Sequence, residues 1–166
     1  MALWGITDAD EAKPKWLTTA QKKEVFANNS GWVVEAGSTQ TGNDNTDAQP
    51  EVLCCVGDLA TGIGAADITE IEFITTAFDK SDGGNIDVRV RFNEQVTVNT
   101  SGGTPTLTIT NDTPSRNLTA TYLSGSTTNE LIFRKTIAAA NAATNAGDVL
   151  SIGANPLALA SGTIKD

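Results

Sequence analysis

The chain has 166 residues, a formal net charge of -9 and no histidine. The negative charge repels nucleic-acid phosphates and anionic membranes, so we expect neither as a partner. Without histidine the chain lacks the usual general base, the commonest zinc ligand and any Ser-His or Cys-His arrangement, which argues against an enzyme. No apolar stretch approaches the ~20 residues of a membrane span. A chain of this length can form one domain or two small ones, and we favour two compact units.

Two features bear on the compartment in which the protein is made. Cys54 and Cys55 are adjacent, so in a strand they point to opposite faces, and two buried free thiols are favoured over a redox or metal role. The N-terminus carries Asp8 and Asp10 in place of the basic end and apolar run of a signal peptide. We therefore expect synthesis and assembly in a cytoplasm.

The first 36 residues differ from the rest because they contain every tryptophan of the chain, Trp4, Trp16 and Trp32. Thr18 or Thr19 can cap a short helix over residues 20–28. Residues 32–34 are expected to form a short strand.

A polar segment separates this region from the next expected strand. Residues 37–49 have no apolar periodicity and are rich in turn formers, which predicts a loop or an extended arm. The apolar run at residues 51–56 predicts a buried strand. Residues 57–67, with Gly62 and Gly64, have the composition of a joint between two units.

From residue 68 onward the pattern predicts β-strands. The clearest covers residues 85–99, in which Ile86, Val88, Val90 and Phe92 alternate with polar and charged side chains. A crossing loop or one helical turn is expected at 138–146. The other strands are expected at residues 68–76, 106–110, 117–123, 129–136, 148–152 and 158–164. About seven strands with regular turns are typical of an immunoglobulin-like sandwich.

The expected fold class is mainly β, with an immunoglobulin-like β-sandwich over residues 67–166 and a small α+β docking region over residues 1–66 whose extended loop is 37–49. Several segments of the second part resemble the bacterial immunoglobulin-like modules of large surface and adhesin proteins. They are VRVRFNEQVTV from Val88, GTPTLTI from Gly103, ATYLSGS from Ala120, NELIF from Asn129 and DVLSIGAN from Asp148.

The N-terminal segments MALWG from Met1, KPKWL from Lys13 and GWVV from Gly31 resemble the start of small virion structural proteins of tailed bacteriophages. Together the two resemblances imply a virion protein with a capsid-docking N-terminal part and an outward immunoglobulin-like part, the plan of many head decoration proteins. They imply the major capsid protein or neighbouring virion subunits as partners, an oligomeric state in the particle, and location in the virion after synthesis in the host bacterial cytoplasm.

Aromatic and basic residues are the candidate partner-binding residues. Three indoles are many for a segment of this size, and aromatic side chains supply large contact areas at interfaces, so Trp4, Trp16 and Trp32 are candidates for anchoring on a partner. The alternative for Trp16 and Trp32 is a small local core. Lys13 and Lys15 can meet an acidic surface, although a solvated face is the more ordinary role of such lysines.

Oxygen-bearing side chains gather in one turn, at Asp79, Asp82, Asn85 and Asp87, as they do in calcium sites. The spacing does not match an EF-hand loop, and Asp, Asn and Gly are ordinary turn residues, so a structural turn is favoured. We therefore predict no metal site, no cofactor and no catalytic residue. No pair of carboxylates is singled out for glycan hydrolysis.

The sequence predicts a non-enzymatic structural protein of a phage virion that decorates or cements the capsid through its N-terminal part and exposes the immunoglobulin-like domain. One alternative is an adhesion or binding module that recognises a cell-surface glycan or protein through its loops. Another is a structural protein of the neck or tail, and the weakest is a β-sandwich hydrolase.

Overall fold

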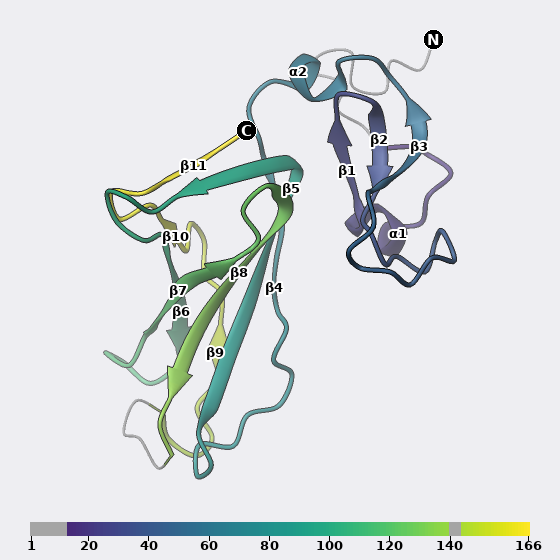
Figure 1. Cartoon of the computed structure of the whole chain (residues 1–166). Coiled ribbons are helices and arrows are strands. Elements are labelled where there is room, and N and C mark those ends of the chain that lie inside the picture. Colours follow the sequence, from purple (N-terminus) through teal and green to yellow (C-terminus); the bar gives the residue numbers. More distant parts are fainter. Residues whose placement is uncertain (1–12, 140–143) are drawn as a thin grey trace. The chain divides into compact units, whose positions relative to one another are not determined.

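The structure is a computed structural model that describes residues 13–139 and 144–166. It is mainly β, with 43% strand and 7% helix, and its strands form a large mixed sheet. The chain divides into two compact units (Figure 1). Unit 1 comprises Met1–Thr69, Phe92–Val96 and Asp166, and unit 2 comprises Glu70–Arg91 and Thr97–Lys165. The boundary expected at residue 66 lies close to this division. The grouping of Phe92–Val96 with the N-terminal region, however, has no signal in the sequence.

Unit 1 begins with a helix that is shorter than expected. Helix α1 covers Thr19–Lys23, and Thr18 is its N-cap. The Thr18 hydroxyl accepts the Gln21 N–H, and the Gln21 side chain accepts the Thr18 N–H, which is a capping box. The expected extension to residue 28 is wrong, because Val25 and the residues after it form a strand, as suits β-branched and aromatic side chains.

Three short antiparallel strands form the sheet of unit 1: β1 (Val25–Asn28), β2 (Gly31–Val34) and β3 (Glu51–Cys55). Gly31 has a φ of +132°, and a Cβ there would lie 2.0 Å from the Cys54 carbonyl oxygen, so the approach of β2 to β3 requires glycine. Strand β3 is not buried as expected. Its Val52 side chain is 46% exposed, since β3 ends the described strand order and pairs with β2 alone.

The core of unit 1 follows from the strand alternation. Val25, Ala27, Trp32 and Val34 share one face of the β1–β2 hairpin and pack in one cluster with Leu17 and with helix α2, which covers Leu59–Ile63. Leu59 and Ile63 are four residues apart, so both face the cluster. This helix lies inside the segment that the sequence predicts to be only a joint.

The loop between β2 and β3 consists of turns, as expected, and side chains hold it in place. The Ser38 hydroxyl donates to Glu24 Oε2 at 2.6 Å, and Gln40 Nε2 donates to the Gln21 carbonyl at 3.0 Å. Asn side chains then close successive turns, with Asn43 Oδ1 accepting the Asn45 N–H at 3.1 Å. The segment is therefore a loop tied to the end of α1, and not an extended arm.

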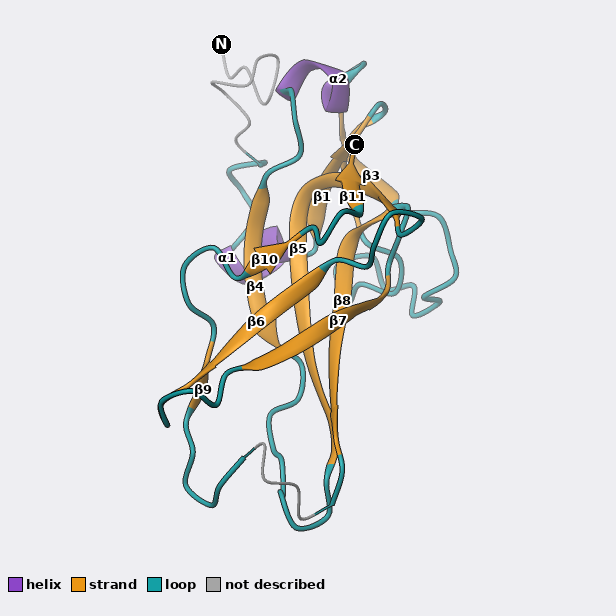
Figure 2. Ribbon diagram, turned by 90° about the vertical axis from the view of Figure 1, so that its left-hand side faces the viewer, coloured by secondary structure: helices purple, strands orange, loops and turns teal. Residues whose placement is uncertain are grey.

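Unit 2 contains the long strands. Their bounds are β4 (Ile68–Phe73, whose first residues belong to unit 1), β5 (Gly84–Asn99, of which Phe92–Val96 belong to unit 1), β6 (Thr106–Asn111), β7 (Leu118–Ser124), β8 (Thr128–Ile137), β9 (Leu150–Ser151), β10 (Leu157–Ala158) and β11 (Thr163–Lys165). The pairing order is β10-β6-β7-β8-β5, with β4 and β11 on β5 and β9 on β6 (Figure 2). This pairing links the strands into one mixed sheet, and it does not confirm the two-sheet sandwich of the predicted immunoglobulin-like fold.

The apolar faces of these strands form the core of unit 2. On β5, Ile86, Val88 and Val90 are at most 2% exposed, which confirms the predicted alternation. They are joined by the buried residues Leu107, Ile109, Leu118, Ala120, Leu131 and Phe133 of β6, β7 and β8. The prediction of one strand over residues 158–164 is wrong. Ala160 and Ser161 have φ values of +48° and +69°, so a turn separates β10 from β11.

Across the two described ranges, neither helix is long or apolar enough to span a membrane.

Candidate functional site

The candidate partner-binding residues of unit 1 begin in the turn before α1. Leu17 donates its N–H to the Pro14 carbonyl at 3.2 Å, and its side chain is buried in the core cluster. This turn leaves Trp16 with 58% of its surface exposed and Lys15 exposed next to it. Trp16 is therefore not part of the local core, and its contact with a partner stays a prediction.

The other two tryptophans have different outcomes. Trp32 is 0% exposed at the centre of the unit 1 cluster, so the expectation that it anchors on a partner is corrected in favour of the local core. The physical reason is its place on β2, between Ala27 and Cys54 on the neighbouring strands, where the indole faces α2. Trp4 lies outside the described residues.

The two candidate lysines also differ. Lys13 is half-buried, and its Nζ donates to the Lys22 carbonyl at 2.8 Å, at the C-terminal end of α1. A cation stabilises that end of a helix, so Lys13 has a structural role in addition to any contact with a partner. Lys15 has an exposed side chain beside Trp16.

The polar face of β5 carries a ladder of ion pairs, which we name the Arg–Glu ladder: Glu70, Glu72, Arg89, Arg91 and Glu130. The side chain of Arg91 is only 6% exposed. Its Nη1 lies 3.0 Å from Glu70 Oε2 and 3.2 Å from Glu72 Oε1. Its Nε donates to Glu130. Arg89 donates through Nε to Glu72 Oε1 at 3.0 Å. The ladder therefore joins β4, β5 and β8 across one face of the sheet.

A further ion pair continues the same face. Arg134 of β8 holds Asp87 of β5 with two bonds of 2.7 Å. The hydrogen bond from Arg134 lowers the pKa of the Asp87 carboxyl, and the same bond raises the pKa of the Arg134 guanidinium. Carboxylates held by arginine in this way serve poorly as general acids, because the cation stabilises their ionised form. The face is therefore suited to joining strands.

The turn that suggested calcium does not gather its oxygens around one point. Asp87 is occupied by Arg134, and Asn85 Oδ1 accepts the Thr136 hydroxyl at 2.7 Å. Asp79 Oδ1 accepts the Ser81 N–H at 2.7 Å, which closes an Asx turn. Over residues 13–139 and 144–166, no group of three or more acidic or cysteine side chains is placed to hold a metal ion.

The adjacent cysteines lie on β3. Both are free thiols; Cys54 packs against the unit 1 core, and Cys55 is exposed. The expectation that both are buried is therefore wrong for Cys55, because it faces away from the core on an edge strand.

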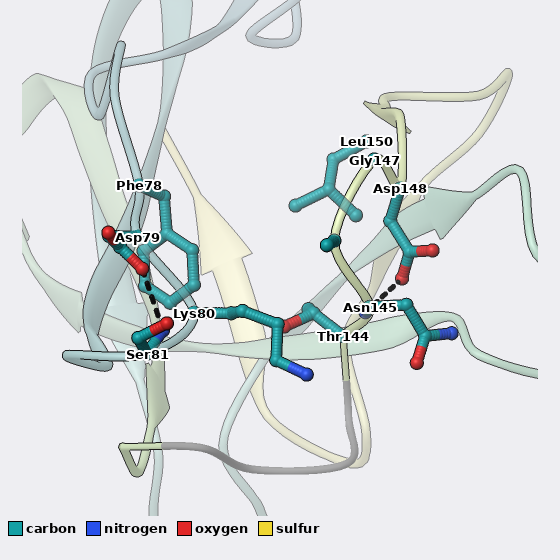
Figure 3. Close-up of a pocket in the computed structure, with 10 residues that line it drawn as sticks. Phe78, Asp79, Lys80, Ser81, Thr144, Asn145, Gly147, Asp148 and Leu150 are labelled. Carbon is teal, nitrogen blue, oxygen red and sulfur yellow. Dashed lines mark hydrogen bonds between the residues drawn. The ribbon is translucent and has the colours of Figure 1, made fainter.

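A pocket of about 340 Å³ lies in unit 2 between residues 78–81, which precede β5, and residues 144–150, which lead into β9 (Figure 3). We name it the loop pocket. Phe78 and Leu150 supply its apolar wall, and both also line an adjoining pocket of about 370 Å³ whose walls include Phe73 and Ile86. Lys80 and Asn145 are among its polar lining residues (Figure 3).

Hydrogen bonds fix the second of these loops. Asp148 Oδ2 accepts from Asn111 Nδ2 at 2.8 Å and from the Asn145 N–H at 2.7 Å, while Oδ1 accepts from the Thr113 hydroxyl at 2.9 Å. The bond from Asn111, with those from Asn145 and Thr113, lowers the pKa of the Asp148 carboxyl. Asp148 therefore fastens the loop to the end of β6 as an ionised anchor.

Thr144 is the unusual member of the loop pocket. Its side chain is 4% exposed, and within the described structure its Oγ1 has no hydrogen-bond partner. Its side chain extends from the loop toward the space facing Phe78–Ser81 (Figure 3). Since buried hydroxyls are nearly always paired, this one is a candidate ligand-binding group.

Comparisons of the chain with protein-family models, with curated proteins and with solved structures found no match.

Sequence reasoning missed both the Arg–Glu ladder and the loop pocket. The alternation of Glu70 and Glu72 with apolar residues could have indicated that acidic side chains face the arginines of β5. No such signal exists for the pocket, because its two loops are more than 60 residues apart and each has an ordinary turn composition.

Proposed function

We propose that this chain is a non-enzymatic structural protein of a bacteriophage virion that decorates or cements the capsid through unit 1. In this proposal unit 2 is an immunoglobulin-like β-sandwich exposed on the particle. The major capsid protein or a neighbouring virion subunit is the partner, and the protein is oligomeric in the assembled particle.

The observation that carries the proposal is the exposure of Trp16. Unit 1 has a closed apolar core around the fully buried Trp32, and Trp16 is left 58% exposed in the turn before α1. Exposing so large an apolar side chain loses the free energy of its burial, about 1.5–3 kcal/mol for a large apolar side chain. Tryptophan is among the residues most enriched where binding energy concentrates, so Trp16 fits an anchor that a partner covers.

The chemistry of unit 2 supports a structural role. Its acidic side chains on the polar sheet face are paired with arginines, which leaves no acid–base pair among the described residues of that face. A protein that binds only the assembled shell stabilises it by mass action, and needs no catalytic group to do so.

The test uses the full chain and particles assembled from the major capsid protein of the same genome. We expect saturable co-sedimentation of the wild-type protein, and at least a tenfold weaker affinity for Trp16→Ala, since loss of a hot-spot residue costs about 2 kcal/mol or more. The matched control is Val52→Ala, which truncates another exposed apolar residue of unit 1 and should leave affinity unchanged.

Two outcomes contradict different parts of the proposal. If Trp16→Ala binds as tightly as the wild type, the docking surface is wrong. If the wild-type protein neither binds the particles nor is detected in purified virions by mass spectrometry, the virion role is wrong.

A binding module is the second candidate function, and the loop pocket of unit 2 is the observation that favours it. Binding sites on β-rich scaffolds commonly lie in the loops at one end.

A further inference from the structure

We infer that the loop pocket between residues 78–81 and 144–150 binds an uncharged sugar ring. This inference goes beyond the docking role, because it concerns unit 2 and does not depend on a contact with the capsid. It rests on one buried hydroxyl, an apolar wall, the charges of the lining and the rigidity of one loop.

The hydroxyl of Thr144 supplies the polar contact. It is 4% exposed and its Oγ1 has no partner among the described atoms, although it lines a pocket of about 340 Å³. Leaving such a group unpaired in the folded protein costs free energy. A ligand hydroxyl can both donate to and accept from the threonine, which recovers that cost on binding.

The apolar wall supplies the second contact. Phe78 and Leu150 are apolar lining residues of the pocket. Lys80 and Asn145 are polar residues of the same lining (Figure 3). A pyranose has one face of C–H groups and an edge of hydroxyls, so it can place its apolar face on the ring of Phe78 and its hydroxyls on Thr144 and Asn145. A purely apolar ligand would leave these polar groups without partners.

Charge selects among polar ligands. The lining contains one cation, Lys80, and two carboxylates, Asp79 and Asp148, and the whole chain has a charge of -9. Phosphates and sugar acids are therefore disfavoured. The carboxylates are already engaged by Ser81, Asn111, Thr113 and Asn145, and Lys80 repels a cation, so cationic ligands are disfavoured as well.

The pocket is also held in shape on one side. Asp148 accepts hydrogen bonds from Asn111 and Thr113, which fasten its loop to the end of β6, and a third from the Asn145 N–H within the loop. A site that is ordered before binding avoids part of the entropy loss on association. The adjoining pocket that shares Phe78 and Leu150 gives room for a second, less polar substituent or sugar unit.

The test is saturation-transfer NMR on the full-length protein with methyl glycosides of glucose, galactose and mannose, with N-acetylglucosamine, and with glucuronic acid as the anionic probe. We expect at least one neutral sugar to bind at millimolar concentration and glucuronic acid to bind more weakly. Thr144→Val removes the hydroxyl at nearly constant volume and should weaken binding about fivefold, the size expected for one hydrogen bond.

Asn145→Ala is the second variant, because the Asn145 side chain is exposed and the bond to Asp148 comes from its backbone N–H. It should also weaken binding. The control is Val149→Ala, whose side chain is 61% exposed and does not line the pocket. It should bind as the wild type does.

The inference is overturned if no neutral sugar binds, if glucuronic acid binds best, or if both Thr144→Val and Asn145→Ala bind like the wild type. Trp16→Ala should keep full sugar binding. Failure of the capsid assay and failure of the sugar assay are therefore independent results.

Discussion

Unit 1 and unit 2 stabilise their sheets by different means. The described tryptophans, Trp16 and Trp32, lie in unit 1, whereas all four arginines of the chain, at positions 89, 91, 116 and 134, lie in unit 2. Unit 1 has strands of four or five residues and packs one apolar cluster around a single large side chain. Unit 2 contains longer strand segments, such as the 10 residues of β8 and residues 84–91 of β5, with an apolar face and an ion-paired face. The sheet of unit 1 is therefore held by one apolar cluster, and that of unit 2 by an apolar face together with ion pairs.

The largest expected effect comes from emptying the centre of unit 1. Trp32→Ala should cost about 3–5 kcal/mol, because it removes the largest fully buried side chain. Urea denaturation followed by far-UV circular dichroism, with hydrogen exchange of the β2 peptides, measures the loss. Trp16→Ala is the control and should change stability by less than about 0.5 kcal/mol. Equal effects of the two substitutions would contradict the assignment of Trp32 to the core.

The second effect comes from breaking the Arg–Glu ladder. Arg91→Met should cost about 3 kcal/mol, the low end for a buried ion pair, since Glu70 and Glu130 lose their shared cation while staying partly solvated. Hydrogen exchange in β4 and β8 should rise, while that of β2 in unit 1 stays unchanged. Lys165→Met, at an exposed position of β11, should have little effect. A stable Arg91→Met variant would show that strand pairing and packing join β4 to β5 without the ion pairs.

A third effect concerns the turn before β5. Gly83 has a φ of +71°, and a Cβ there would lie 2.5 Å from the Ile137 carbonyl oxygen. Gly83→Ala should cost about 2 kcal/mol or more, from backbone strain and the steric clash together. Gly42→Ala in unit 1 is the matched control, because its φ is +73° but nothing lies within 4 Å of the added Cβ. If the two variants lose equal stability, the close approach to Ile137 carries no cost.

The smallest effect is a difference in pH dependence. Because Arg134 lowers the pKa of Asp87 in the folded state, this pair stabilises unit 2 at pH values above the unfolded pKa of about 3.9, and the contribution is lost as pH falls through the lower folded value. Asp87→Asn should therefore flatten the loss of stability as the pH falls below about 4. Thermal unfolding at a series of pH values measures it, and an unchanged acid slope would contradict the role of the pair.

The strands of unit 2 could be predicted because alternation is a local property. The expected strand at 85–99 differs from β5 by one residue at its start, and the one at 106–110 differs from β6 by one residue at its end. Those at 117–123 and 129–136 differ from β7 and β8 by one residue at each end. Short elements were harder to predict from the sequence. Val25 follows a capped helix directly, and only its pairing with Val34 makes it part of a strand.

The sites could be predicted only in part, since they depend on distant contacts. The exposure of Trp16 and the burial of Trp32 are decided by the turn at Pro14 and by α2, not by the residue type. The arginines of β5 were expected on the polar face, but their acidic partners come from β4 and β8. Thr144 lies in a segment with no periodic pattern, so its burial beside Phe78 has no signal in the sequence.

The assignment of Phe92–Val96 to unit 1 has a consequence for synthesis. Ala27 of β1 pairs with Glu94, and Asn93 exchanges hydrogen bonds of 2.7 and 3.0 Å with Asp67, so the first unit is completed by residues that are translated after the second has begun. A ribosome that has released only residues 1–69 has not yet supplied that segment. Unit 1 therefore reaches its final form only after the first strands of unit 2 have been made, and the two units mature in an interleaved order.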